Sequence, residues 1–322
     1  MKYFITGATG FVGGEIVRQL VKAGHEVRAV VRDPQKAKWM EELRVKLYKG
    51  DVTEKESMRE GMTGVDGVFH VAGWYKLVER TKGEAYAVNV KGTTNVLELM
   101  QELKIPKGVY TSTCAVNSNT QGKTIDETYR FSGAYRTTYE RTKGEAHRIA
   151  EKFIQDGLPL VIAMPGMIYG PNDTSAVRSS LIDFLKGKLP AIPAKSVMQW
   201  TRVEDCAQAH IVMTEKGRVG EAYIISGEKS TVVELYRMAA EISGAKMPMI
   251  LPDELLLFMS KLSRPFDRWL PDTFTSEGLV SIAGLSYLSD DGKARRELGF
   301  APRPIREGWT ETVRHEMKLL GM

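Results

Sequence analysis

Short apolar segments alternate with amphipathic stretches along the first half of the chain. Between the first two of these segments, Val12, Ile16 and Leu20 recur at helical spacing, and Gly24 closes the pattern. The apolar segments span residues 3–6, 27–31, 45–48, 67–71, 108–111 and 158–164. Short buried strands separated by helices are typical of a parallel sheet covered on both faces, so the pattern predicts an α/β, doubly wound Rossmann fold.

The pattern changes after Gly170-Pro171, where prolines, scattered aromatic residues and the apolar stretch LPDELLLFMSKL indicate a smaller, mainly helical C-terminal lobe. We expect residues 1–172, with a return segment at 197–226, to form the larger domain. Residues 173–196 and 227–322 then form the smaller lobe. No internal repeat or low-complexity linker separates the two parts, so they are expected to pack tightly.

Composition narrows the possible functions. The 322 residues carry a net charge of +5 without a basic run, which argues against a nucleic-acid partner. Two cysteines and five histidines lack metal-ligand or disulfide-framework spacing, so no metal site is predicted. The chain enters an apolar strand at once and has no run long enough to span a membrane. These features predict a cytoplasmic protein.

Three glycines form a turn between the first strand and the first helix. Gly7, Gly10 and Gly13 lie in TGATGFVG. In this context Gly7 permits a tight turn, Gly10 lets a pyrophosphate approach the backbone, and Gly13 lets helix and strand pack closely. The turn as a whole, including Thr9, Phe11 and Val12, is therefore expected to bind a dinucleotide.

The turn and seven later motifs carry a resemblance that covers nearly the whole chain. The later motifs are GDV (50–52), FHVAG (69–73), VNVKGTTNV (88–96), VYTST (109–113), YERTK (139–143), PGMIYGP (165–171) and VEDCAQAH (203–210). Together they resemble the extended short-chain dehydrogenase/reductase superfamily. VRDP at 31–34 and FHVAG look most like its dihydroflavonol 4-reductase and hydroxysteroid dehydrogenase branch.

Tyr139 and Lys143 are the only Tyr-x-x-x-Lys pair, and helical spacing places both on one face. A tyrosine needs a lowered pKa to act as acid and base near pH 7, and a lysine cation about 4 Å away could supply that stabilisation. The same spacing also occurs on solvated helices. In the resembling family the tyrosine donates the proton, and the lysine holds the cofactor ribose.

The resemblance implies two further polar residues at the reaction site. A hydroxyl residue at the end of the strand aligns the substrate oxygen. The family's position for this residue, the last of a run of hydroxyl residues, falls on Thr113 in this chain, and strand alternation allows only one of Ser112 and Thr113 to face the cofactor. Asn89 would support the Lys143 end through a water, although capping a helix is an equal use for it.

The remaining cofactor contacts are also implied by the resemblance. Asp51 and Val52 would hold the adenine, Ala72 and Gly73 would pass close to the cofactor backbone, and Pro165 with Ile168 would shape the nicotinamide pocket.

Arg32 and Asp33 point to different nicotinamide cofactors. An arginine here pairs with the 2′-phosphate of NADP, whereas an acidic residue pairs with the ribose 2′-hydroxyl of NAD. The family alignment puts Val31 last in the strand and Arg32 next. We therefore predict NADP, with NAD as the alternative.

Two departures from the nucleotide-sugar enzymes of the superfamily bear on the substrate. Those enzymes carry arginines where this chain has Met164 and Met198. The residues predicted near the substrate are Thr113 and four aromatic residues: Trp74, Tyr75, Tyr169 and Trp200. Packing in a core is the commoner use of any single one of these aromatic residues. The pattern favours a fairly hydrophobic, uncharged carbonyl substrate.

Three functions follow from these features. The favoured one is an NADP-dependent ketone or aldehyde reductase. The others are a sugar or nucleotide-sugar epimerase or dehydratase, and a non-catalytic NADP-binding regulatory protein. The helices expected at 92–103 and 142–155 build a homodimer seam in resembling proteins. Leu97, Met100, Ile149 and Phe153 could serve there or in the core.

Overall fold

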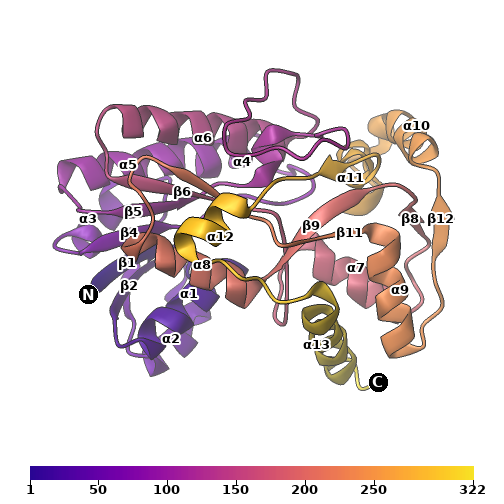
Figure 1. The fold of residues 1–322 in the computed structure, drawn as a ribbon, viewed down its shortest axis with the longest axis horizontal. Helices are drawn as coiled ribbons and strands as arrows, with labels where there is room; N and C mark the ends of the chain where they lie inside the picture. Colours follow the sequence, from indigo (N-terminus) through magenta and orange to yellow (C-terminus); the bar gives the residue numbers. More distant parts are fainter.

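The computed structural model describes residues 1–322 as two packed lobes, with the larger sheet in the N-terminal half (Figure 1). Seven parallel strands form this sheet in the order β10-β6-β5-β4-β1-β2-β3. Their bounds are β1 Lys2–Thr6, β2 Glu26–Val31, β3 Lys46–Lys49, β4 Gly67–His70, β5 Gly108–Thr111, β6 Leu160–Pro165 and β10 Ala222–Ile225. The predicted doubly wound fold is confirmed.

Strand alternation divides the core of this domain into two layers. Tyr3 and Ile5 of β1 belong to one buried cluster, whereas Phe4 between them belongs to the other. In Figure 1, α5 (Gly92–Glu102) and α6 (Thr138–Gln155) cover one face, and α1 (Phe11–Lys22), α2 (Lys38–Glu42) and α8 (Val203–Glu215) lie along the other. Helix α3 (Glu56–Met62) packs against β2 and β3.

Helix α5 continues from the short helix α4 (Glu84–Tyr86) through a π-helical turn at Ala87–Lys91. Leu97 and Met100 of α5 are buried in the core of their own domain. This corrects their proposed place at a homodimer seam, because neither side chain has surface left for a partner. Ile149 and Phe153 of α6 pack against the same core and keep part of their surface exposed.

The second lobe is helical, as predicted, but it also contains two small sheets that the sequence pattern did not show. Strand β9 (Val197–Arg202) pairs with β7 (Met167–Tyr169), β11 (Glu228–Thr231) and β13 (Ser286–Tyr287), while β8 (Ala191–Pro193) pairs with β12 (Met249–Leu251). The helices of this lobe are α7 Ala176–Leu185, α9 Val232–Ser243, α10 Asp253–Ser263, α11 Ser276–Ile282 and α13 Ile305–Leu319. Helix α12 (Gly292–Leu298) instead packs on β10 and α8, and its Ala294 and Leu298 are buried in the core of the large domain. This corrects the expectation that all of residues 227–322 belongs to the smaller lobe. None of the helices could cross a membrane.

The expected return segment 197–226 is divided between the two lobes. Strand β9 lies in the small sheet, whereas α8 packs on α1 and β10 forms the edge of the large sheet. This corrects the placement of residues 197–202, because the strand VMQWTR includes polar residues and does not indicate in which sheet it lies.

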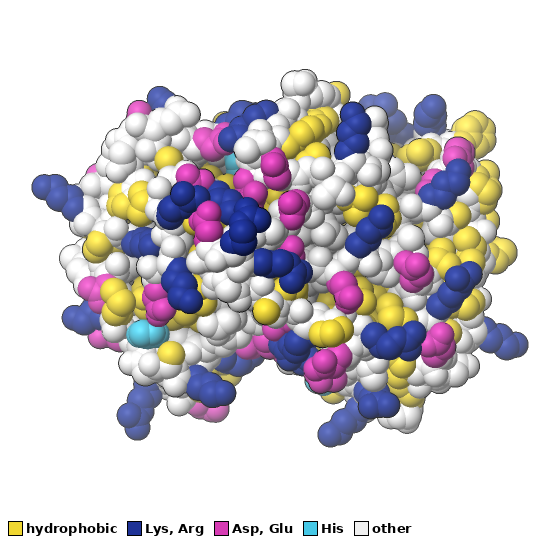
Figure 2. Space-filling view, in the orientation of Figure 1, with side chains coloured by type: hydrophobic (Ala, Val, Ile, Leu, Met, Phe, Trp, Pro, Cys, Tyr) yellow, Lys and Arg dark blue, Asp and Glu magenta, His cyan; other side chains and the backbone are white.

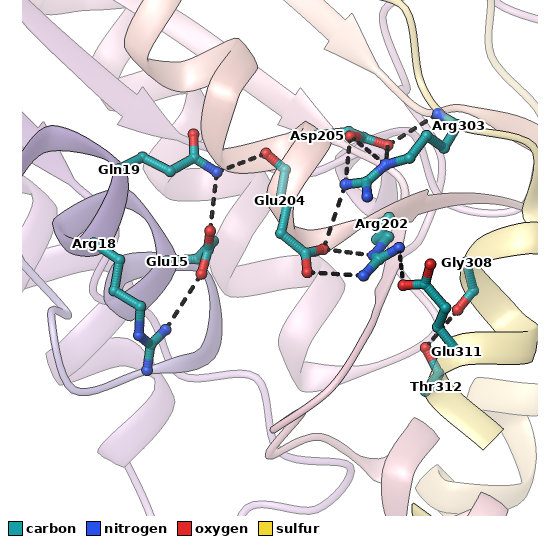
Figure 3. A network of polar contacts seen from close by, with 10 residues as sticks. All are labelled: Glu15, Arg18, Gln19, Arg202, Glu204, Asp205, Arg303, Gly308, Glu311 and Thr312. Atoms are coloured by element: carbon teal, nitrogen blue, oxygen red, sulfur yellow. Dashed lines mark hydrogen bonds and ion pairs between the residues drawn. The ribbon is translucent and has the colours of Figure 1, made fainter. Parts of the chain in front are cut away.

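Charged side chains join the lobes where α8 begins (Figure 3). Asp205 accepts hydrogen bonds from the backbone and the guanidinium group of Arg303, at 2.9–3.3 Å. Arg202 pairs with Glu204 at 2.8 Å and also with Glu311 of α13. This network ties helix α8 of the large domain to the C-terminal segment of the chain.

Candidate active site

The glycine turn follows β1 at the carboxyl edge of the large sheet. Gly7 has a φ of +74°, and a Cβ there would lie 2.6 Å from the backbone nitrogen of Ala72. A Cβ at Gly13 would lie 2.2 Å from the carbonyl oxygen of Gly7. Both positions therefore require glycine, one for the turn and one for the close packing of α1 on it.

The N-terminus of α1 is open for an anion. Gly10 occupies the capping position with extended backbone, no side chain caps the helix, and no acidic residue lies in its first turn. The N–H groups of Phe11, Val12 and Gly13 have no partner within the helix, because the first turn of an α-helix leaves its donors free. Thr9 beside them is exposed. This cradle suits a pyrophosphate.

Arg32 follows β2 and lies next to the same edge. Its side chain is 78% exposed and its nearest charged partner is Asp51, with 3.9 Å between nitrogen and oxygen. The carboxylate of Asp33 caps the following turn by accepting from the backbone of Gln35 at 3.0 Å. Arg32 is thus free to bind an anion, whereas Asp33 is already used in the fold.

Asp51 and Val52 follow β3. The Asp51 carboxylate accepts from the backbone and the hydroxyl of Thr53, both at 2.8 Å, which orders this turn. Val52 is buried against Gly92 of α5.

Asn89 lies inside the π-helical turn and is fully bonded. Its side-chain oxygen accepts from the backbone N–H of Trp74 at 2.7 Å. Its amide donates to the Trp74 carbonyl and the Thr142 hydroxyl, each at 3.0 Å. Asn89 therefore caps no helix and makes no direct bond to Lys143. It fixes the chain after Ala72 and Gly73 against α6.

Ser112 and Thr113 follow β5, and their hydroxyls have different partners. The Ser112 hydroxyl bonds Nδ1 of His147 at 2.7 Å on the α6 side. The Thr113 hydroxyl accepts from the backbone of Ala115 at 3.1 Å and also stabilises the ionised form of Tyr139. The choice of Thr113 over Ser112 fits this geometry.

Helix α6 presents both members of the Tyr-x-x-x-Lys pair. Thr137 caps it by accepting from the backbone of Glu140 at 3.1 Å. Burial raises the pKa of Tyr139, and the Thr113 hydroxyl only partly offsets this. This corrects the expectation that Lys143 brings the pKa of Tyr139 down: without a bound cofactor the phenol keeps its proton at neutral pH.

Lys143 instead faces the end of β5. Its Nζ donates to the carbonyl of Thr111 at 2.8 Å and to the hydroxyl of Tyr110 at 3.1 Å. Burial lowers the pKa of Lys143 to about 7, because a cation is costly in a site that excludes water.

Tyr110 and His70 form a layer behind Lys143 that the sequence analysis did not assign. Their rings stack with 5.5 Å between centroids. His70 bonds the hydroxyl of Thr6 at 2.8 Å and that of Thr93 at 3.0 Å, and burial lowers its pKa to about 3. The neutral imidazole thus supports the ring beside the lysine. The sequence offered little signal for this role: His70 ends β4, whereas Tyr110 lies within β5, one residue before its end.

The aromatic residues predicted near the substrate do not share one environment. Tyr75 is 50% exposed, and its hydroxyl bonds that of Thr174 in the second lobe at 2.9 Å. Trp74 is buried and donates to Glu84 at 3.2 Å. Tyr169 and Trp200 belong to the core of the second lobe around Trp309. Both side chains are buried there and have no surface for a substrate, which corrects their predicted place at the site.

Pro165 ends β6 beside Ile225, and Ile168 packs partly exposed against the core of the large domain. Met164 and Met198 are buried, in the cores of the large domain and the second lobe respectively. The two positions that carry arginines in nucleotide-sugar enzymes are therefore interior apolar positions in this chain.

Comparisons with known proteins identify the family and the fold. The model of the NAD dependent epimerase/dehydratase family matches residues 3–226. A sterol demethylase protein B of Methylococcus capsulatus is 28% identical, over 97% of both chains. A putative dihydroflavonol 4-reductase of Synechocystis is 28% identical, over 97% of this chain and 93% of that one.

A third relative is a 4-hydroxy-2-methyl-3-oxo-4-farnesyl-3,4-dihydroquinoline-1-oxide ketoreductase of Stigmatella aurantiaca. It is 27% identical, over 98% of this chain and 96% of that one. Among solved structures, gox2253 superimposes with a TM-score of 0.85 and 29% identity, covering 99% of this chain and 98% of that one.

Proposed function

Since the chain belongs to the NAD dependent epimerase/dehydratase family, we propose that it is an NADP-dependent reductase of a fairly hydrophobic, uncharged ketone or aldehyde. Family membership and the reductases among its relatives make it an NAD(P)-dependent oxidoreductase of the short-chain dehydrogenase/reductase type. The observation that carries the finer proposal is the buried phenol of Tyr139 near Thr113, at the edge of the sheet that also bears the glycine turn; burial raises the pKa of Tyr139, and the Thr113 hydroxyl partly offsets this.

The residues present fit a dinucleotide. A Cβ at Gly10 would meet only the Gly7 carbonyl oxygen, at 3.1 Å, so the backbone is open to a pyrophosphate. Asp51 and Val52 would hold the adenine, and Arg32, which has no close ion pair, supports a 2′-phosphate. Ala72, Gly73, Pro165 and Ile168 would line its path toward the nicotinamide.

When bound, the nicotinamide would supply the hydride that the carbonyl carbon accepts. Tyr139 would donate its proton to the carbonyl oxygen, and Thr113 would orient that oxygen through its hydroxyl. Lys143 would hold the ribose, with its ammonium group fixed by the Tyr110 hydroxyl and the carbonyl of Thr111. Asn89 would act indirectly. Its amide links the backbone of Trp74, which follows Gly73, to Thr142, the residue before Lys143.

Two methionines and the names of the relatives favour reduction of an apolar molecule over epimerisation of a nucleotide sugar. Buried Met164 and Met198 offer no charge to a diphosphate. Relatives over nearly the whole chain are named for sterol, dihydroflavonol and farnesyl-dihydroquinoline compounds. Trp74 and exposed Tyr75 remain the aromatic residues closest in sequence to the cofactor-binding Gly73.

We assign the cofactor to residues 1–172 and 203–226, and the substrate mainly to the second lobe. Both cysteines are unpaired and buried, which supports a reducing, cytoplasmic setting. A homodimer through α5 and α6 remains part of the proposal, with partly exposed Ile149 and Phe153 in its seam. Light scattering on the purified chain tests the dimer.

The decisive test is NADPH oxidation across aldehydes, ketones and nucleotide sugars. We expect turnover with apolar carbonyl compounds and none with nucleotide sugars. Tyr139→Phe should retain NADPH affinity while kcat falls by about 10²–10⁴. Tyr129→Phe, a variant of a tyrosine outside the site, should keep wild-type kcat. Tightly retained cofactor without net NADPH consumption would point instead to an epimerase.

A further inference from the structure

Helix α10 and the segment after it expose a row of large apolar side chains. These residues are between 38% and 67% exposed: Leu255, Phe258, Met259, Leu262, Phe266 and Trp269. We call them, with the basic residues described below, the α10 face. Figure 2 shows hydrophobic side chains gathered at the edge of the second lobe where Figure 1 labels α10 and β12. A monomer rarely leaves so many apolar side chains together in water.

The row is not required for packing within the chain. The opposite side of α10 buries Leu256 in a small cluster with Leu279 and Ala283 of the α11 region. Positions 255, 258, 259 and 262 recur at helical spacing on the outer side. The helix thus has one face for the protein and another without a partner.

Three cations lie among these apolar residues. Lys261, Arg264 and Arg268 are exposed, and no carboxylate lies within ion-pair distance of any of them, although Arg268 stacks on Trp269 at 4.7 Å. The acidic groups nearby are already engaged.

Two of these acidic groups are neutralised by cations outside the row. Glu254 pairs with the Lys195 side chain at 2.9 Å, and Asp272 pairs with Arg80 at 2.6 Å. Asp253 is buried and accepts from the backbone of Lys195, and half-buried Asp267 accepts from the backbone of Ser276 at 2.7 Å. The three exposed cations therefore outnumber Asp267, the one partly exposed carboxylate without a cationic partner, and the α10 face is apolar with a net positive charge.

We propose that the α10 face docks the protein onto the surface of an anionic phospholipid bilayer. Apolar side chains on one helix face insert at the boundary between headgroups and acyl chains, and interspersed lysine and arginine residues bind the anionic headgroups. Tryptophan is enriched at that depth, which suits exposed Trp269. Since no helix could span the membrane, the protein lies on the surface.

The α10 face is connected to the proposed reaction site. Arg80, in the loop after Trp74 and Tyr75, donates to the carbonyls of Asp267 and Leu270 at 3.1 and 2.8 Å. Glu277 of α11 accepts from the backbone of Thr138, next to Tyr139. Docking here would present the substrate lobe to a membrane-dissolved carbonyl compound, an extension that rests on the proposed reductase function.

Vesicle flotation of the full chain, without cofactor or substrate, tests the surface. We expect binding to vesicles of phosphatidylcholine and phosphatidylglycerol, weaker binding to phosphatidylcholine alone, and loss at high salt. Trp269 fluorescence should shift to the blue on binding, because the other four tryptophans are largely buried or half-buried.

Two double variants separate the contribution of the apolar side chains to vesicle binding from that of the basic side chains. Phe258→Ser/Leu262→Ser and Arg264→Glu/Arg268→Glu should each weaken binding at least about tenfold. The controls Val219→Ser, at an exposed apolar site elsewhere, and Lys22→Glu/Lys216→Glu should bind as the wild type does. Circular dichroism establishes that each variant is folded.

Absence of vesicle binding, equal binding to neutral vesicles, or unchanged binding of both variant pairs would overturn the docking surface. Dimers lost in Phe258→Ser/Leu262→Ser, seen by light scattering without vesicle binding, would assign the face to a second copy instead. Vesicle binding without any NADPH turnover would leave the surface intact and overturn the reductase.

Discussion

Arg32 stands on the surface at the end of β2 with one distant ion pair, to Asp51. If it binds the 2′-phosphate, Arg32→Ser should raise the KM for NADPH about tenfold or more and leave kcat nearly unchanged, because charged hydrogen bonds contribute about 1.5–3 kcal/mol. Lys38→Ser, at an exposed position on α2, should leave the KM unchanged. An equal loss of NADH affinity would contradict phosphate binding.

Lys143 makes the stability of the cofactor-free protein depend on pH. Burial lowers the pKa of Lys143 to about 7 from an ordinary 10.5. Between these values the unfolded chain binds more protons than the folded one, so this residue makes the free energy of unfolding rise with pH.

Lys143→Met should remove that contribution. We expect its Tm to rise less than the wild-type Tm between pH 7 and pH 9, and turnover to be lost. Tyr139 does not interfere, because burial raises its pKa further above this window. The exposed Lys216→Met should keep the wild-type pH dependence of Tm. An identical pH dependence in Lys143→Met would show that the lysine is solvated.

At the scale of single elements, α1 depends on its close approach to the glycine turn. A Cβ added at Gly13 would lie 2.2 Å from the carbonyl oxygen of Gly7, so Gly13→Ala should displace the turn. We expect loss of NADPH binding by fluorescence titration and destabilisation by about 1–3 kcal/mol in urea unfolding.

Gly14→Ala is the matched control in the same helix turn. Its Cβ would lie 3.3 Å from the carbonyl oxygen of Ala8, the nearest atom. Small local adjustment and the helix propensity of alanine should keep its stability near that of the wild type. Equal effects of the two variants would show that helix propensity, and not contact with the turn, explains the result.

The strands of the large sheet were predictable at this scale because each is a short apolar run between helices. The residues 108–111 predicted for a strand are those of β5. The small sheets were not predictable, because β8, β12 and β13 have only two or three residues each. A run of that length has no measurable period.

At the scale of the whole molecule, the charged network of Figure 3 joins the two lobes. Asp205→Ala should remove the bonds to the backbone and side chain of Arg303 and destabilise the protein by about 1–3 kcal/mol. We expect a loss of stability near the lower end of this range, because the Arg303 side chain is 35% exposed and solvent screens its charge.

Glu241→Gln supplies the comparison, because its partner Arg306 and Glu241 itself are 67% and 60% exposed. Its effect on urea unfolding should stay below about 1 kcal/mol. A larger loss in Glu241→Gln than in Asp205→Ala would show that the network does not hold the lobes together.

The sequence by itself determined the sheet, the glycine turn and the positions of Tyr139 and Lys143, because these depend on local periodicity and on spacing within one helix or turn. The choice of Thr113 over Ser112 rests on the family resemblance and stays a prediction. Tertiary structure decided what lies around them. It buried Tyr169, Trp200, Leu97 and Met100 in cores, and it left Arg32 free while Asp33 capped a turn. It also packed Lys143 against Tyr110, because burial and protonation depend on contacts between segments far apart in the chain.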